Sequence, residues 1–195
     1  MKRSHPLERD KDYRILSIDP GTHTLGLIVS EVGIGTRLTI RSIETLNGSF
    51  LANRYEGLIA VRNDKTARLK GIKDRFREIL ELWNPDIVIS EAPYLGGMVT
   101  AYTGLVECLW VLQESLYEYN PSLLFNRIDP ASVKKAMGVS GKSGDKSLVK
   151  EAIIKRKHWL ELPEGITLEG LDEHQADALA VALHYCLDRK LLISD

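Results

Sequence analysis

The feature that most constrains this chain is a hydrophobic strand whose last residue is an acid. In ILSIDPGTHTLGL, residues 15–27, an apolar run ends at Asp19 and then turns through Pro20 and Gly21. Apolar and β-branched residues bounded by Pro and Gly predict a buried strand, here residues 13–19. Two kinds of chemistry would use such an acid. It could hold a divalent metal for phosphodiester cleavage, or the Asp-Pro-Gly-Thr turn could be a phosphate-binding loop of an ATPase.

Length and composition predict one globular domain over residues 13–190, preceded by a flexible charged arm, residues 1–12. The chain has 195 residues, of which 44% are hydrophobic, which suffices for one well-buried core. No apolar run approaches the ~20 residues of a membrane helix, and the charged N-terminus is not a secretory signal. Cys108 and Cys186 are isolated and lack CxxC spacing. We therefore expect both thiols to be buried and the protein to lie in a reducing cytoplasm. This would be the cytoplasm of a host cell if the chain is phage-encoded. We expect no membrane partner.

Charge is segregated along the sequence although the net charge is only −1. Residues 134–158 hold 8 Lys and Arg residues against two acids, and acids dominate residues 161–177. A basic flank beside an acidic centre fits an enzyme that binds phosphates and holds metal ions. A solvated, lysine-rich helix face would produce the same pattern, so charge alone does not decide the function.

Periodicity predicts an alternation of strands and helices. Strands 13–19, 24–31 and 37–43 form an antiparallel meander joined by glycine-bearing turns, and residues 44–65 read as an irregular loop. A helix from Thr66 ends at Asn84-Pro85 and leads at once into the apolar strand DIVISE, which a crossover places parallel to the first strand. The remaining predicted elements are a helix at 98–119, a strand at 123–129, a helix near 146–157 and a final helix at 172–187.

This order of elements is that of a ribonuclease H-like α/β fold. We expect a central mixed five-stranded sheet, an antiparallel meander plus parallel strands, flanked by helices. The first and fourth strands would be neighbours, so Asp19 and Glu91 would lie side by side. The helix at 98–119 is apolar on more than one face, which predicts burial in the core or in a dimer interface.

The final helix adds a second pair of candidate ligands at its start. His174 and Asp177 are three residues apart and share one face of the first turn. Together with Asp19 and Glu91 they would form a pocket for two Mg²⁺ ions, with Mn²⁺ able to substitute, because these ions prefer oxygen ligands and bind phosphates. Each residue alone could be an ordinary cap or turn residue; the conjunction favours a metal site.

The chain resembles the RuvC family of Holliday-junction resolvases, within the ribonuclease H-like nucleases, and its departures would fit a phage-type member. The matching segments are SIDPGTHTLGLIVSE, PDIVISEAPY, DPASVKKAMGVSGKSGDKSLV and HQADALAVALHY, in family order over residues 13–187. The resemblance implies a homodimer that nicks four-way DNA junctions symmetrically with divalent metal. It puts the four metal-site positions at Asp19, Glu91, His174 and Asp177. It also makes the following residues candidates for DNA contact: Lys134, Lys135, Lys142, Lys146 and Tyr94.

Several alternatives remain beside this interpretation. The long segment 44–65 and the unusual helix sequence MVTAYTGLVECLWVLQ fit a member with a broader preference for branched DNA. A ribonuclease H-like module that binds branched DNA without cutting it is a further possibility.

AMGVSGKS, residues 136–143, imitates a nucleotide loop, but DPASVKK rather than an apolar strand precedes it. The actin-like ATPases that share the Asp-Pro-Gly-Thr turn need two such domains. We therefore expect no nucleotide cofactor.

Overall fold

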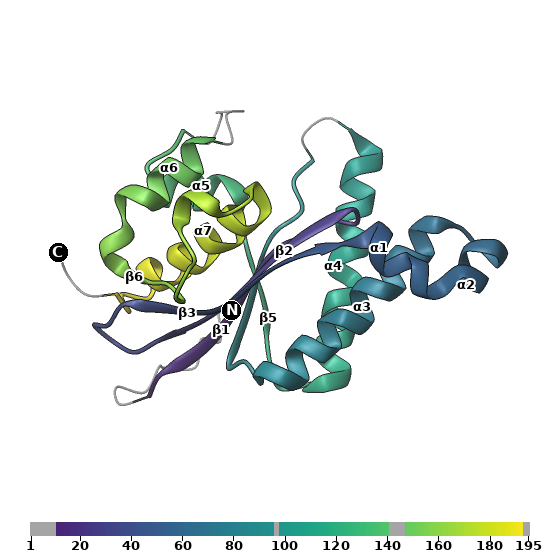
Figure 1. Ribbon diagram of the computed structural model, residues 1–195, viewed down its shortest axis with the longest axis horizontal. Helices are drawn as coiled ribbons and strands as arrows, with labels where there is room; N and C mark the ends of the chain where they lie inside the picture. Colours follow the sequence, from purple (N-terminus) through teal and green to yellow (C-terminus); the bar gives the residue numbers. More distant parts are fainter. Residues whose placement is uncertain (1–10, 96–97, 141–146, 193–195) are drawn as a thin grey trace.

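One mixed sheet organises the molecule, for which the computed structural model describes residues 11–95, 98–140 and 147–192 (Figure 1). The sheet order is β5-β4-β1-β2-β3-β6. The first three strands form an antiparallel meander, β4 and β5 run parallel to β1, and β6 pairs in parallel with β3. The strand bounds are Tyr13–Asp19 (β1), Thr24–Val32 (β2), Leu38–Asn47 (β3), Ile87–Glu91 (β4), Phe125–Ile128 (β5) and Leu160–Glu161 (β6).

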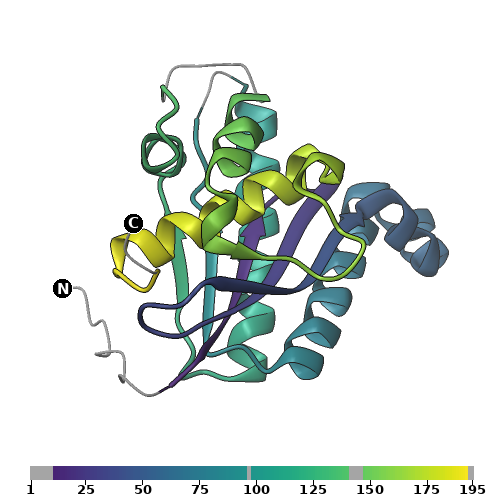
Figure 2. The same ribbon diagram turned by 60° about the vertical axis from the view of Figure 1, so that its left-hand side comes forward.

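Helices cover both faces of this sheet (Figures 1 and 2). On one face lie α1 (Gly48–Ala52), α3 (Asp64–Trp83) and α4 (Val99–Tyr119), with α2 (Glu56–Val61) packed against α3. On the other face lie α5 (Pro130–Ala136), α6 (Ser147–Lys155) and α7 (Glu173–Asp188). The ribonuclease H-like α/β prediction is thus confirmed in its layers and in its strand order.

The sheet separates two hydrophobic clusters, which explains why its central strands are apolar throughout. In β1, Ile15 packs in the cluster under α7, whereas Leu16 and Ile18 pack in the cluster under α3 and α4. Successive strand residues point to opposite faces, so a strand covered on both sides has no polar alternation. Both cysteines are free and buried, as predicted.

The helix signals at α3 were predicted correctly because they are local. The side chain of Asn63 accepts a hydrogen bond from the Thr66 amide at the start of the helix, and Asn84 ends it in the left-handed conformation with φ of 43°. Asn tolerates this region better than most residues, and Pro85 cannot continue the helix. The short link then feeds β4, which pairs in parallel with β1 as expected.

Two expectations about the elements were wrong. The sheet has six strands rather than five, because β6 is a two-residue strand beside Leu38 and Thr39, too short to show any periodicity. Residues 44–65 are not a loop: β3 continues to Asn47, and α1, a 3₁₀ turn and α2 follow. Helices of one or two turns carry little pattern of their own and depend on tertiary packing, here the burial of Leu51 and Ala52.

Helix α5 was missed although its start signal is present in the sequence. The Asp129 side chain accepts a hydrogen bond from the Ser132 amide, and Pro130 occupies the first turn. Asp followed by Pro is a favoured helix start.

Within the described residues, no helix is long and apolar enough to cross a membrane.

Candidate active site

The carboxyl ends of β1 and β4 bring the first two candidate ligands together. Ile18 is registered with Ser90 in the parallel ladder, so the next residues, Asp19 and Glu91, follow at adjacent positions on one edge of the sheet. Parallel neighbours end at the same edge, which is why the sequence alone could place this pair. We call this the catalytic edge.

Helix α7 begins at the same edge and carries the other two candidates. Asp172 and Gln175 form a reciprocal capping box that fixes the first turn. Nδ1 of His174 lies 2.8 Å from Oδ2 of Asp19, and the nitrogen is the donor because an ionised carboxylate only accepts. Gly26 of β2 permits this approach, since a Cβ atom there would lie 2.1 Å from the His174 carbonyl oxygen.

Two polar residues that sequence reasoning missed anchor the start of α7. The Thr45 hydroxyl on β3 donates to the Asp172 carboxylate at 2.5 Å. The Lys150 ammonium on α6 donates to the carbonyl oxygens of Glu169 and Leu171 at 2.6 and 2.7 Å. Lys150 belongs to the basic segment, yet it supports the backbone before α7. A lysine that serves the backbone in this way has no sequence signal that separates it from one that contacts DNA.

The electrostatics of the catalytic edge differ from those of an ordinary surface. Burial, and then the charges of Asp19 and Asp177, raise the pKa of Glu91 from 4.5 to about 8, although Lys134 partly opposes this. The hydrogen bond that His174 donates to Asp19 raises the pKa of His174, against the effect of burial. Asp19, Asp177 and Lys134 therefore all lie within electrostatic range of Glu91. Carboxylates that disfavour one another's charge mark a functional site more often than a structural one.

The donor set at this edge fits a hard divalent cation. Three carboxylates and an imidazole are ligands of Mg²⁺ and Mn²⁺ type, and a cation would relieve the repulsion that raises the pKa of Glu91. Among the described residues, no three Asp, Glu, His or Cys side chains are close enough together to hold one ion. The four residues thus share an edge and an electrostatic environment without forming a closed cage.

Comparisons with known proteins place this geometry in context. No protein-family model matches the chain. The chain is 27% identical over 179 residues to a crossover junction endodeoxyribonuclease RuvC of Thermotoga petrophila, covering 91% of this chain and 94% of the relative. It is 26% identical over 179 residues to that of Thermotoga maritima, covering 91% and 92%. The chain is therefore similar to RuvC proteins over nearly its whole length.

The solved structures agree with this assignment at the level of the fold. Thermus thermophilus RuvC in complex with a Holliday junction substrate has a TM-score of 0.69 at 21% identity, with 91% of this chain and 95% of that chain covered. The yeast mitochondrial Holliday junction resolvase has a TM-score of 0.61 at 16% identity, covering 91% and 79%. The RuvC fold is therefore kept although few residues are shared.

The DNA-contact candidates fall at different places in the structure. Lys134 and Lys135 occupy the last turn of α5, and only Lys134 affects the pKa of Glu91. Tyr94 lies three residues beyond Glu91 and is 69% exposed, as an aromatic available for stacking must be. Lys142 and Lys146 lie outside the described residues.

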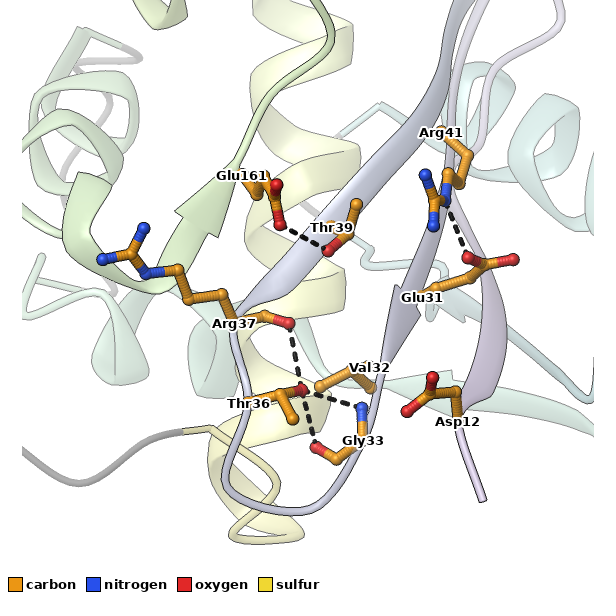
Figure 3. Close-up of a pocket in the computed structure, with 9 residues that line it drawn as sticks. All are labelled: Asp12, Glu31, Val32, Gly33, Thr36, Arg37, Thr39, Arg41 and Glu161. Atoms are coloured by element: carbon orange, nitrogen blue, oxygen red, sulfur yellow. Dashed lines mark hydrogen bonds and ion pairs between the residues drawn. The ribbon is translucent and has the colours of Figure 1, made fainter. Parts of the chain in front are cut away.

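A hollow of about 290 Å³ at the opposite edge of the sheet is a poor candidate for the RuvC active site (Figure 3). Two of its three acids are already paired: Glu31 accepts from Arg41 at 2.7 Å and Glu161 accepts from Thr39 at 3.1 Å. Paired groups of this kind stabilise the local structure and leave few polar atoms for a ligand. The catalytic edge is therefore the better candidate for an active site.

Proposed function

We propose that this protein is a metal-dependent endonuclease that resolves four-way (Holliday) DNA junctions by paired symmetric nicks. The observation that carries the proposal is the convergence of Asp19, Glu91, His174 and Asp177 at one sheet edge, where the charges of Asp19 and Asp177 help to raise the pKa of the partly buried Glu91. The similarity to proteins named as crossover junction endodeoxyribonucleases supplies the substrate class.

The four side chains would hold two Mg²⁺ ions, with Mn²⁺ as a competent substitute. Such ions, when bound, help to activate the attacking water and neutralise charge on the leaving 3′ oxygen. The protein's own contribution is positioning. The β1–β4 ladder fixes Asp19 against Glu91, and the capped start of α7 holds His174 against Asp19 with a proton at Nδ1. The partly buried edge strengthens each of these interactions.

Charge and exposed aromatic surface near the catalytic edge support DNA as the substrate. Lys134 lies close enough to Glu91 to lower its pKa, which is where a cation could hold the phosphate that neighbours the scissile bond. Lys135, Lys142 and Lys146 extend the same basic segment along the chain. Tyr94 would stack on an unpaired base, since base–aromatic stacking is tolerant of sequence.

A homodimer would supply the two sites that paired nicks require. One face of α4 is exposed and apolar, with Trp110 at 63%, Tyr117 at 49% and Val106 at 40% exposure. These residues repeat at four- and seven-residue intervals, so they share a stripe, while residues such as Leu112 and Leu116 bury the opposite face. A second copy of this chain would cover the stripe and point two catalytic edges at one junction.

The decisive experiment is cleavage of a labelled four-way junction beside linear duplex, flap and three-way DNA, with and without Mg²⁺. We expect metal-dependent symmetric nicks confined to the four-way junction, and no cleavage by the Asp19→Asn variant. Equal cutting of all branched forms would replace junction resolution by a broader branched-DNA endonuclease activity. Binding without cutting would indicate a non-cleaving branched-DNA-binding module, and cleavage by Asp19→Asn would refute the site.

A further inference from the structure

The turn that follows Asp19 carries a second polar pair on the α3 side of the sheet. Arg68 of α3 is only 9% exposed, and His23, four residues after Asp19, is exposed. Nη1 of Arg68 lies 2.6 Å from Nδ1 and 2.9 Å from Nε2 of the His23 ring. A largely buried guanidinium therefore lies against an exposed histidine in the turn that follows Asp19.

One donor of the Arg68 guanidinium has no hydrogen-bond partner among the described residues. The guanidinium carries five N–H groups, and its Nε is buried without a hydrogen-bond partner. The Asp64 carboxylate lies 3.2 Å from Nε, but that side chain is 55% exposed and so only partly offsets the buried charge. A buried, under-satisfied cation is costly unless an anion completes it.

Packing holds this pair rigidly at the edge. The amide of Gly48, the first residue of α1, donates to the His23 carbonyl oxygen at 2.8 Å. A Cβ atom at position 48 would lie 2.3 Å from the Thr22 carbonyl oxygen and 3.3 Å from Cδ of Arg68. Only glycine lets α1 press the turn against Arg68, so the guanidinium is positioned before any ligand arrives (Figure 1 shows α1 beside α3).

The pair lies on the opposite side of Asp19 from Lys134. Arg68 belongs to the face covered by α1, α3 and α4, whereas Lys134 belongs to α5 on the other face. A DNA strand that crosses the catalytic edge would thus meet a cation on each side of the four acidic-site residues. Arginine suits phosphate because its planar fork donates two parallel hydrogen bonds.

We infer that Arg68 and His23 form a binding subsite for one backbone phosphate of the DNA strand, adjacent to the scissile phosphate and across the catalytic edge from Lys134. The subsite rests on the proposed function, because it takes DNA as its ligand. Arg68 supplies the positive charge, and the exposed His23 ring, which contacts Nη1, orients the guanidinium toward the strand.

Methylphosphonate interference tests this subsite at the level of a single phosphate. All proteins carry Asp19→Asn so that the DNA stays intact, and the junctions carry one neutral methylphosphonate at a time along the strand that flanks the crossover. In the parent protein one position should weaken binding roughly tenfold, as expected for one charge-assisted contact. The Arg68→Gln and His23→Ala variants should bind natural DNA more weakly and be insensitive to that same methylphosphonate.

Arg77→Gln is the matched control, because it lies on the same helix nine residues further on and pairs with Glu81. It should leave both affinity and the methylphosphonate pattern unchanged. Since Arg68→Gln could destabilise α3, the exposed His23→Ala is the second variant, and a thermal melt of each protein checks folding.

The outcomes separate the subsite from the proposed function. The subsite would be overturned if the variants bound natural DNA as tightly as the parent protein. It would also be overturned if the variants bound more weakly by the same factor at every methylphosphonate position. Either result would leave junction resolution intact. A parent protein that binds no junction would overturn the proposed function and the subsite with it.

Discussion

Two glutamates at opposite edges of the same sheet have opposite electrostatic environments. Glu31 of β2 is registered with Arg14 of β1 and accepts hydrogen bonds from Arg14 at 2.6 and 2.9 Å and from Arg41 at 2.7 Å. These bonds, Arg14 first, lower the pKa of Glu31 in spite of its partial burial. Burial and two neighbouring carboxylates instead raise the pKa of Glu91 to about 8.

The difference favours the edge that carries Glu91 as the candidate active site. An acid matched by arginines is structural, because its charge is already compensated within the fold. An acid that lies among other acids destabilises the folded protein through charge repulsion. Proteins retain such an arrangement at sites where a ligand or a cation offsets the repulsion. The comparison therefore sets Glu91 apart from Glu31 although both occupy strands of one sheet.

The largest expected effect separates the two glutamates by activity. Glu91→Gln should reduce junction cleavage about a thousandfold or more, roughly 4 kcal/mol in activation free energy, because it removes a candidate metal ligand. Glu31→Gln should leave the rate within about twofold, since it changes only an ion pair at the other edge. Single-turnover cleavage of a four-way junction measures both rates. Equal losses in the two variants would remove the distinction between the edges.

A smaller effect concerns stability against pH in the absence of divalent cations. The folded-state pKa of Glu91 lies above its ordinary value of 4.5, at about 8. The contribution of Glu91 to the free energy of unfolding is therefore fully present below about pH 4.5 and is lost as the pH rises through about 8. Denaturant titrations should show the wild-type protein losing up to a few kcal/mol over this window, at ~1.4 kcal/mol per pKa unit, with a flatter profile for Glu91→Gln.

Glu31 and added cations provide the controls for that profile. The pKa of Glu31 is lowered, so its stabilisation is present above its ordinary pKa and is lost as the pH falls; Glu31→Gln should matter only there. Mg²⁺ at pH 8 should restore stability to the wild-type protein and less to Glu91→Gln, because binding to the folded state stabilises it. A wild-type profile as flat as that of Glu91→Gln would contradict the raised pKa.

The smallest expected effect compares a lysine from each edge. Lys134→Ala should weaken junction binding and lower the slope of log affinity against log salt by about 1, the value for one phosphate contact. Lys11→Ala should leave the slope unchanged, because Lys11 pairs with Asp86 away from the catalytic edge. Fluorescence anisotropy over a range of salt concentrations measures both slopes. An unchanged slope for Lys134→Ala would remove it from the DNA interface.

The sequence by itself determined the strand order and the sheet edge at which Asp19 and Glu91 meet. Long apolar strands and the capped helices α3 and α7 carry strong local patterns, and a short crossover after α3 allows little choice of direction. The pairing of β1 with β4 follows from these signals. The positions of His174 and Asp177 on the first turn of α7 follow from helical spacing.

Only the tertiary structure decided the short elements and the partners of the polar residues. Helices α1 and α2 and strand β6 are too short to show a period, and they form because α3 and β3 offer surfaces to cover. Lys150 supports the backbone before α7, and Arg68 lies buried beside His23. Those roles depend on contacts between residues far apart in the chain, so no local pattern distinguishes them from ordinary surface cations.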